Sequence, residues 1–284
     1  MNMTIREAIS KASLQFKTKN IEAPKLKARL LMQFILKQTR QYIIVYDEKN
    51  LTLKQEKRYF EKVEKIIQGI PLQHITHQQE FMKMNFYVSK DVLIPRPDTE
   101  VLVEEVIKIA KKINAKKILD LCTGSGAIAI SLAKYIPNSQ ITATDISHKA
   151  LEIAEKNAKN NEVDKQIAFL YSDLLQQIPK EKYDMIVSNP PYIQRGLIKS
   201  LEEEVQKEPQ IALDGGWDGL DFYRRIIKQA DEYLKYGGYL CLEIGYDQKI
   251  DVIDLIEQEE KYTDTYGKKD LYGNDRVIIT KVGD

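Results

Sequence analysis

The 284-residue chain is poor in cysteine and has no long apolar run. Its two cysteines, Cys122 and Cys241, are too few for a disulfide framework, and we expect both to lie reduced inside strands. No apolar stretch approaches the roughly 20 residues that a membrane-spanning helix needs. The first residues alternate charged and apolar side chains and have no signal-peptide centre. These absences predict a cytoplasmic protein without a membrane partner.

The net charge of +1 hides an uneven distribution. Residues 1–90 hold 17 Lys and Arg against 8 Asp and Glu, whereas the rest of the chain holds 26 against 34. The first part therefore carries +9 and the remainder −8, which suggests two units with different surfaces. The basic part is either a solvated helical surface or a docking face for an acidic or ribosome-bound partner.

Helical patterns fill the first third of the chain. Thr4 with Glu7, and Thr52 with Gln55, have the spacing of capping boxes ahead of apolar periodicities. Pro24 suits the first turn of a helix that continues through Leu36. We expect a small helical domain at residues 1–72.

A connector with a short β-hairpin is predicted at residues 73–98. Alternation between Phe81 and Val92 is consistent with the hairpin, and Pro95 and Pro97 make the following segment rigid. A helix from Thr99 to about Lys112 then opens a third region, residues 99–284.

Strand and helix alternate through this third region. Strands are predicted at Lys117–Cys122, Gln140–Asp145, Ile167–Ser172, Tyr183–Ser188, Tyr239–Ile244 and Arg276–Lys281, and helices at Gly126–Tyr135, Lys149–Asn160, Leu220–Tyr236 and Gln248–Gln258. The alternation with nearly continuous apolar strands predicts an α/β fold with a parallel sheet covered on both faces.

The stretch ILDLCTGSGAIAISLA is a strand, a glycine turn and a helix. Gly124 and Gly126 allow the backbone to approach a ligand, and the free N–H groups of the helix start face the same point. Asp145 ends the next strand, where its carboxylate can accept both hydroxyls of a ribose. The spacing Gly124-x-Gly126-x-x-Ala129 is also compatible with a dinucleotide fingerprint.

Two further carboxylates bear on which cofactor is bound. Asp120 ends the strand before the glycines, where an anion would repel a pyrophosphate but suit an ammonium group. It therefore favours S-adenosylmethionine over a nicotinamide cofactor, the alternative being a helix-capping carboxylate. Asp173, after the third strand, could accept the adenine amino group or be an ordinary turn residue.

The segment VSNPPYI places a stiff turn directly after a buried strand. Pro190 and Pro191 fix two φ angles and exclude a helix. The Asn189 side-chain oxygen and the Pro190 carbonyl could accept the two N–H bonds of a planar –NH2 group, and Tyr192 could stack on that group. This predicts methyl transfer from sulfur to nitrogen by an in-line displacement, driven by proximity and orientation and without a base. The alternative is a turn that only terminates the strand.

Two other motifs are less specific. Arg96, Asp98 and Glu100 could line the entrance to the cofactor pocket or brace the connector. His74, His77 and Glu80 follow one another at three-residue steps, but no further ligand supports a metal site and none is predicted.

These motifs together resemble the class I S-adenosylmethionine-dependent methyltransferases, and more narrowly the family of peptide chain release factor glutamine N5-methyltransferases. The resemblance covers essentially the whole chain. Besides NPPY it includes LIPRPDTE, LDLCTGSG, EPQIALDGGWDGLDFYRRI, LEIGYDQ and DLYGNDRVI. NPPY alone is shared with DNA adenine methyltransferases, so the combination with IPRPDTE and a helical N-terminal domain is what specifies the family.

The resemblance implies a Rossmann-like methyltransferase fold and methylation of the glutamine in the Gly-Gly-Gln motif of release factors. It implies that S-adenosylmethionine lies against Cys122, Thr123, Gly124, Ser125 and Gly126, and against Asp145 and Asn189. It places the substrate glutamine at Asn189, Pro190, Pro191 and Tyr192. The chain departs from the family at Cys122, where glycine is common, and at Leu174, where an aromatic residue often covers the adenine.

Two other functions remain open. One is N6-adenine methylation of DNA or RNA, against which the acidic catalytic half argues, and the other is a non-catalytic nucleotide-binding module. We expect no direct nucleic-acid substrate. The helical domain is interpreted as a recognition unit, whose Lys17, Lys19, Lys25, Lys27 and Arg29 could contact the release factor.

Overall fold

The computed structural model describes residues 2–283, which divide by their contacts into two compact units. Unit 1 runs to His77 and includes Glu202–Lys207, and unit 2 comprises Gln78–Leu201 and the chain from Glu208 onward. The predicted domains, residues 1–72, 73–98 and 99–284, stay a prediction. The predicted domains do not include one feature of the structure, which is that the segment Glu202–Lys207 makes its contacts with unit 1.

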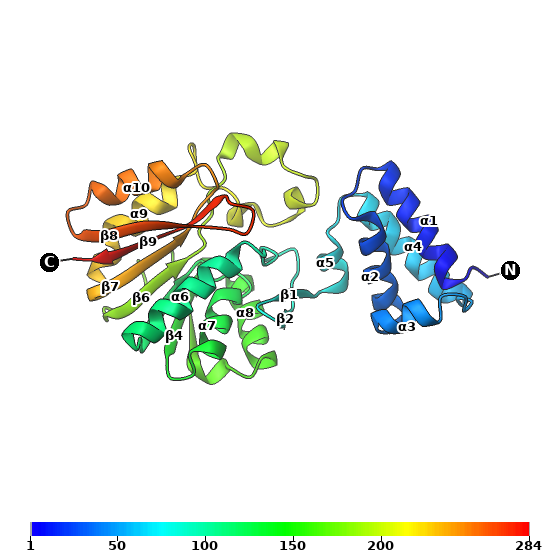
Figure 1. Ribbon diagram of the computed structural model, residues 1–284, viewed down its shortest axis with the longest axis horizontal. Helices are drawn as coiled ribbons and strands as arrows, with labels where there is room; N and C mark the ends of the chain where they lie inside the picture. The colour runs from blue at the N-terminus through cyan, green and yellow to red at the C-terminus, as the bar shows by residue number, and fades with distance from the viewer. Residues whose placement is uncertain (1, 284) are drawn as a thin grey trace. The chain divides into compact units, whose positions relative to one another are not determined.

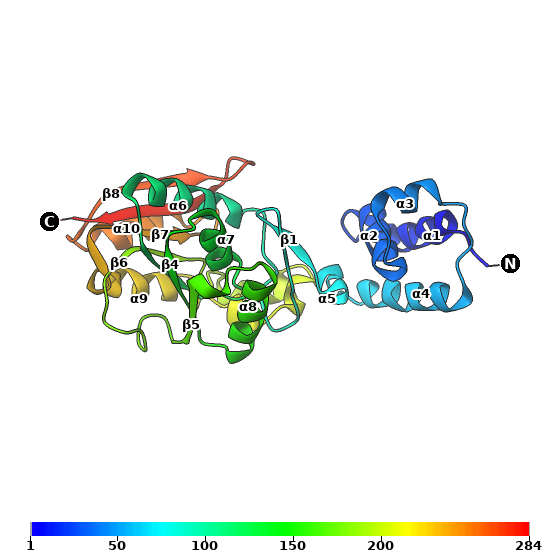
Figure 2. The same ribbon diagram turned by 90° about the horizontal axis from the view of Figure 1, so that it is seen from below.

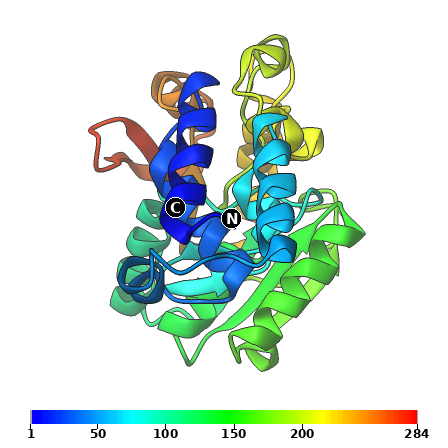
Figure 3. The ribbon, with the colours of Figure 1, turned by 90° about the vertical axis from the view of Figure 1, so that its right-hand side faces the viewer.

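Unit 1 is made of helices (Figure 3). They are α1 (Ile5–Thr18), α2 (Pro24–Leu36), α3 (Arg40–Val45), α4 (Leu53–Ile67) and α5 (Leu72–Thr76). Both predicted capping boxes are formed, at Thr4–Glu7 and Thr52–Gln55. The apolar faces of α1, α2 and α4 bury a common core in which Phe16 and Tyr59 are fully enclosed.

Two short helices of unit 1 were not predicted. The Thr39 hydroxyl accepts the Tyr42 N–H and so begins α3, and Pro71 precedes α5. Each helix is too short to show an apolar periodicity. Glu204 of the segment 202–207 forms a half-buried ion pair with Lys27, and Gly69, at φ +80°, leaves room for Glu203.

The connector contains the predicted hairpin. Its strands are β1 (Gln79–Phe81) and β2 (Met84–Phe86), so the hairpin begins two residues before the predicted alternation. Met82 and Lys83 between the strands both have positive φ, as a two-residue hairpin turn requires.

Within the described residues, unit 2 contains a seven-stranded sheet of order β5-β4-β3-β6-β7-β9-β8. The strands are β3 (Lys117–Leu121), β4 (Gln140–Asp145), β5 (Ile167–Tyr171), β6 (Tyr183–Ser188), β7 (Leu234–Glu243), β8 (Tyr262–Lys269) and β9 (Asp275–Val282). From β5 to β7 all pairs are parallel, but β9 is antiparallel to both β7 and β8. The prediction of a parallel sheet is therefore wrong at this edge.

Helices cover both faces of the sheet (Figures 1 and 2). They are α6 (Thr99–Ile113), α7 (Ala127–Tyr135), α8 (His148–Asn160), α9 (Asp221–Gln229) and α10 (Lys249–Glu257). One apolar cluster joins α6 and α7 to one face, and a second joins α9 and α10 to the other. The predicted class, a Rossmann-like doubly wound sheet with a helical N-terminal part and a hairpin connector, is confirmed.

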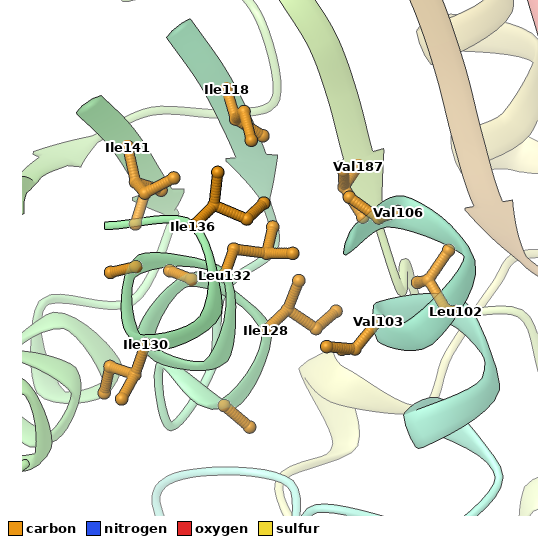
Figure 4. Packing of buried hydrophobic residues seen from close by; sticks show 14 of the residues in the cluster. Leu102, Val103, Val106, Ile118, Ile128, Ile130, Leu132, Ile136, Ile141 and Val187 are labelled. Atoms are coloured by element: carbon orange, nitrogen blue, oxygen red, sulfur yellow. The ribbon is translucent and has the colours of Figure 1, made fainter. Parts of the chain in front are cut away.

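The first cluster shows how the alternation along the strands builds the core (Figure 4). Ile118 and Val187 point from neighbouring strands toward Ile128 and Leu132 of α7, while Val103 comes from α6. All five side chains are at least nine-tenths buried. Parallel strands between two helical layers need apolar residues on both faces, as the sequence pattern indicated.

Two predicted elements end differently in the structure, and one strand was not predicted. The helix predicted to reach Tyr236 ends at Gln229. Strand β7 begins at Leu234, next to Tyr233, whose carbonyl accepts a hydrogen bond from the Tyr183 N–H. Strand β8 was missed because it lies at the sheet edge with much of its surface exposed. Cys122 lies just beyond β3 at φ +59° rather than inside the strand.

Short 3-10 turns occupy several connections. They are Asp164–Gln166, Arg195–Ser200, Val205–Lys207, Gln210–Ala212 and Ala230–Glu232. Among residues 2–283, no helix has the length and apolar character needed to cross a bilayer.

Candidate active site

The glycine turn between β3 and α7 begins with three residues of unusual backbone. Cys122, Gly124 and Gly126 all have positive φ, which explains why glycine suits the position of Cys122. A Cβ on Gly124 would meet nothing within 4 Å, whereas a Cβ on Gly126 would lie 2.9 Å from Ile130. Gly124 therefore leaves an open surface, and Gly126 allows close helix packing.

Asp120 lies fully buried beneath this turn. Its Oδ2 accepts the Thr123 hydroxyl at 2.6 Å and the Ala129 N–H at 3.2 Å, so it caps α7. Its Oδ1 has no hydrogen-bond partner among the described residues. Burial raises the pKa of this carboxyl to about 7, against the hydrogen bonds from Thr123 and Ala129. The capping role is thus present, and one oxygen is left over.

Asp145, at the end of β4, lies next to the same turn. Its Oδ2 accepts the Gly124 N–H and its Oδ1 the Ser147 N–H, both at 2.9 Å. Burial raises the pKa of Asp145, opposed by these backbone hydrogen bonds. The carboxylate is held in one orientation, and each oxygen keeps a lone pair for a ligand.

The third predicted carboxylate, Asp173, is already paired with a basic side chain that the sequence did not indicate. It forms an ion pair with Arg225 of α9, with 2.8 Å between Oδ1 and Nη2. Leu174 follows at φ +51° with its side chain 5% exposed. Leu174 therefore supplies apolar cover beside a carboxylate that is already paired.

The turn after β6 holds its side chains through contacts on both sides. Asn189 Nδ2 donates to the Thr99 hydroxyl at 3.2 Å, which turns the amide oxygen away from Thr99. Pro190 and Pro191 are buried, and the Tyr192 hydroxyl donates to Glu243 at 3.5 Å. Burial raises the pKa of Tyr192, so this hydroxyl stays protonated.

Two later segments of the chain clamp the backbone of this turn. Gln248 donates to the Tyr192 carbonyl at 3.0 Å, and Ile193 exchanges hydrogen bonds with Leu213 and Gly215. A Cβ on Gly215 would lie 2.7 Å from the Tyr192 backbone. The motifs around Gly215 and Gln248 thus position the NPPY turn, a role that the sequence did not reveal.

The residues of IPRPDTE brace the connector. Arg96 pairs with the buried Glu208, Asp98 lies 3.3 Å from Arg276, and Glu100 accepts the Met82 N–H at 2.6 Å. None of the three lines the pocket described below. Of the two interpretations of this motif, the structure favours bracing.

A pocket of about 210 Å³ lies between the glycine turn and the Asn189 turn. Its predicted lining residues are Cys122, Gly124, Asp145, Asp173, Leu174, Asn189 and Pro191. Predicted site residues that do not line it are Asp120, Thr123, Ser125, Gly126, Pro190 and Tyr192. The lining residues that were not predicted are Asp91, Val92, Leu93, Ile146, Ser147, Ala150, Ser172, Pro209, Ile211, Ala212, Phe222 and Arg225.

Leu93, Pro209, Ile211, Ala212, Phe222 and Arg225 lie in motifs that contributed to the resemblance, whereas the other six come from segments without a motif. Glu243 and Thr99 were also missed, although both lie in motifs that contributed to the resemblance. Within residues 2–283, no group of three His, Cys, Asp or Glu side chains is arranged to hold a metal ion.

Comparison with known proteins identifies the family to which the chain is similar. Residues 97–272 match the model of the "Methyltransferase small domain" and residues 7–76 that of the "PrmC N-terminal domain". A release factor glutamine methyltransferase of Clostridium acetobutylicum is 38% identical over 99% of both chains. One of Buchnera aphidicola is 40% identical over 98% of this chain and 99% of its own.

The chain belongs to the release factor glutamine methyltransferase family. It is a methyltransferase, and the family recognised from its motifs is confirmed.

Solved structures of lower identity share the fold of this family member. A methyltransferase from Pyrococcus furiosus aligns with a TM-score of 0.54 at 18% identity, over 79% of this chain and 99% of its own. The hMettl16 catalytic domain, solved with the MAT2A 3'UTR hairpin 6, aligns with a TM-score of 0.57 at 15% identity. That alignment covers 75% of this chain and 80% of the hMettl16 chain.

Proposed function

We propose that the protein methylates the side-chain amide nitrogen of the glutamine in the Gly-Gly-Gln motif of peptide chain release factors. The observation that carries the proposal is the orientation of Asn189. Its Nδ2 donates to Thr99, so its Oδ1 is available to accept an N–H from the substrate amide. The Pro190 carbonyl would accept the second N–H, and Tyr192 would cover the flat face of the amide.

We propose S-adenosylmethionine as the cofactor. Three features fit it: the open surface over Gly124, the fixed carboxylate of Asp145 and the unpartnered Oδ1 of the buried Asp120. Asp145 would hold the ribose hydroxyls and the Asp120 region the amino-acid end. Cys122, Thr123, Ser125 and Gly126 would contribute backbone, and Leu174 would cover the adenine. Because Asp173 is paired with Arg225, its role toward the adenine requires that this pair rearrange or share its oxygens.

The bound cofactor supplies a methyl group activated by its sulfonium. The protein's own part is to hold an amide nitrogen, whose lone pair is delocalised, on the axis of displacement. Two fixed acceptors at Asn189 and Pro190 also stabilise the positive charge that develops on that nitrogen. The prolines limit the ordering that remains to be done on binding.

The proposed partner is a protein rather than a nucleic acid. Residues 91–284 carry a net charge of −8, which would weaken contact with a long phosphate backbone. The cytoplasmic location predicted from the sequence stays a prediction.

Mass spectrometry of a release factor incubated with the enzyme and S-adenosylmethionine tests the proposal. We expect one added methyl group on the glutamine of the Gly-Gly-Gln loop. A release factor with asparagine in place of that glutamine is the control and should stay unmodified. An adenine-containing oligonucleotide in the same assay tests the rival activity. Methylation of the adenine, or none of the glutamine, would contradict the proposal.

A further inference from the structure

A buried carboxylate lies behind the Asn189 turn. Glu243 ends β7, and its side chain is 1% exposed. Sheet register pairs Ser188 with Leu242, so the next residues along the two strands are Asn189 and Glu243. Glu243 Oε2 has no hydrogen-bond partner in the part of the chain that the structure describes. Burying a carboxylate with one unpartnered oxygen is costly, which suggests a role beyond packing.

Charged and titratable groups face Glu243 from every side. Tyr192 approaches from the turn after β6, Arg276 from β9 and Asp98 from the residue before α6. The Tyr223 hydroxyl of α9 donates to the main-chain carbonyl of Glu243 at 2.9 Å. Burial raises the pKa of Glu243 to about 7, opposed by Thr99, Arg276 and Tyr192 and increased by Asp98. Arg276 itself engages Asp270, Asp98 and the Ile244 carbonyl.

Thr99 connects this carboxylate to the Asn189 amide. Its side chain lies close enough to Glu243 to lower the pKa of that carboxyl, and its Oγ1 accepts the Asn189 Nδ2–H at 3.2 Å. A hydroxyl has a single proton to donate. When an ionised Glu243 takes that proton, Thr99 can only accept from Asn189. The –NH2 end of the amide is then directed to Thr99, and the oxygen faces the other way.

We propose that Glu243 and Thr99 are positioning residues that hold the Asn189 side chain in the one amide orientation that presents Oδ1 to the substrate nitrogen. This inference rests on the proposed function, because orientation matters only where Oδ1 accepts an N–H from the substrate. In the flipped orientation, the Asn189 –NH2 group would face the substrate –NH2 group, and no hydrogen bond would form.

The protonation state of Glu243 changes this constraint. A neutral carboxyl can donate to Thr99 Oγ1, which frees the Thr99 proton for the oxygen of a flipped Asn189 amide. The raised pKa therefore places the loss of orientation near pH 7, with the correct orientation on the alkaline side. Turnover should fall as the pH falls below this value.

Steady-state kinetics of three single variants and one double variant test whether Glu243 acts on Asn189 through Thr99. Thr99→Val removes the acceptor without changing the shape, and Thr99→Ser is the control that retains it. We expect Thr99→Val and Glu243→Gln each to lower kcat by roughly tenfold or more, with cofactor binding unchanged and Thr99→Ser close to wild type. In Glu243→Gln, the decrease of kcat below about pH 7 should disappear. The double variant should lose no more than the worse single variant, whereas independent losses that multiply would overturn this inference.

Nuclear magnetic resonance of the protein without substrate gives a second readout that does not depend on turnover. In the wild type, the side-chain amide signals of Asn189 should follow the titration of the Glu243 carboxyl carbon. Thr99→Val should abolish this coupling and Thr99→Ser should keep it. Asn189 signals that ignore the Glu243 titration would overturn the inference. Failure of the wild type to methylate the release factor would instead refute the proposed function.

Discussion

Asn189 is the side chain on which the proposed chemistry depends most directly. It is half-buried, lines the pocket and already has its –NH2 group engaged by Thr99. Replacing it by alanine removes one of the two proposed acceptors for the substrate amide and leaves the neighbouring prolines in place. The effect should therefore appear in the chemical step rather than in the fold.

We expect Asn189→Ala to lower kcat by roughly 10²–10³-fold, the loss that accompanies removal of one positioned polar group in other enzymes. Steady-state kinetics with a release factor measures this change. Calorimetry with S-adenosylmethionine is the control for cofactor binding, and circular dichroism is the control for folding. A folded variant that binds cofactor and retains near-normal turnover would contradict the assigned role.

Asp120 should make the stability of the free protein depend on pH. Its folded-state pKa of about 7 lies above the ordinary 3.8, so the folded protein binds more protons between these values. The stabilising contribution is complete below the unfolded pKa and is lost as the pH rises toward 7. Asp120→Asn removes this dependence. The free energy of unfolding of the variant relative to wild type should rise between pH 4 and 8, by up to about 4 kcal/mol.

Urea denaturation of both proteins across this pH range provides the comparison. An equal pH dependence in wild type and variant would show that Asp120 is ionised in the folded protein.

The loop before α9 and Gln248 together clamp the NPPY turn. Gly215 lies against the Tyr192 backbone, Gln248 holds the Tyr192 carbonyl, and Ile193 hydrogen-bonds Leu213 and Gly215. These contacts link a turn of four residues to two motifs that follow it in the chain. The rigidity of the NPPY turn is therefore a property of three segments and not of its prolines alone.

We expect Gly215→Ala to disturb this clamp, because the new Cβ would lie 2.7 Å from backbone atoms of Tyr192. Overpacking of this kind typically costs about 1–3 kcal/mol, and kcat should also fall as the turn shifts. The control is Gly196→Ala, where a Cβ meets nothing within 4 Å. Thermal denaturation and methylation assays of both variants measure the two effects. Equal behaviour of the two variants would exclude the clamp.

The two units of the chain differ in charge, which bears on how a protein substrate is recognised. Lys17, Lys19 and Lys25 are exposed on unit 1. Lys27, which the sequence grouped with them, is paired with Glu204 and is less available to a partner. The proposed substrate, a Gly-Gly-Gln loop, offers little surface, so the proposed function requires further contacts with the release factor to provide affinity.

Reversing Lys17, Lys19 and Lys25 to glutamate should raise KM for the release factor by about five- to tenfold at low salt, with kcat unchanged. The difference should shrink as salt screens the charges. The matched control reverses Lys159, Lys165 and Lys180, which are exposed on unit 2. The same KM in the unit 1 variant and wild type would remove these lysines from the docking face.

Local patterns were sufficient for most elements and for several of the residues that line the pocket. Capping boxes located α1 and α4, and the apolar runs located β4 and β6 to the residue. Glycines and prolines marked both turns that border the pocket. These features were predictable because caps, periodicities and restricted φ angles act over only a few residues.

Other features depend on contacts between residues far apart in the chain, and only the tertiary structure decided them. The antiparallel edge at β9, the pairing of Asp173 with Arg225 and the contact between Thr99 and Asn189 are of this kind. In the sequence, Glu243 is indistinguishable from any other residue at the end of a strand. Only the structure shows its neighbours and the burial that raises its pKa. Burial and long-range partners determine the chemistry of such a group, and a local pattern contains neither.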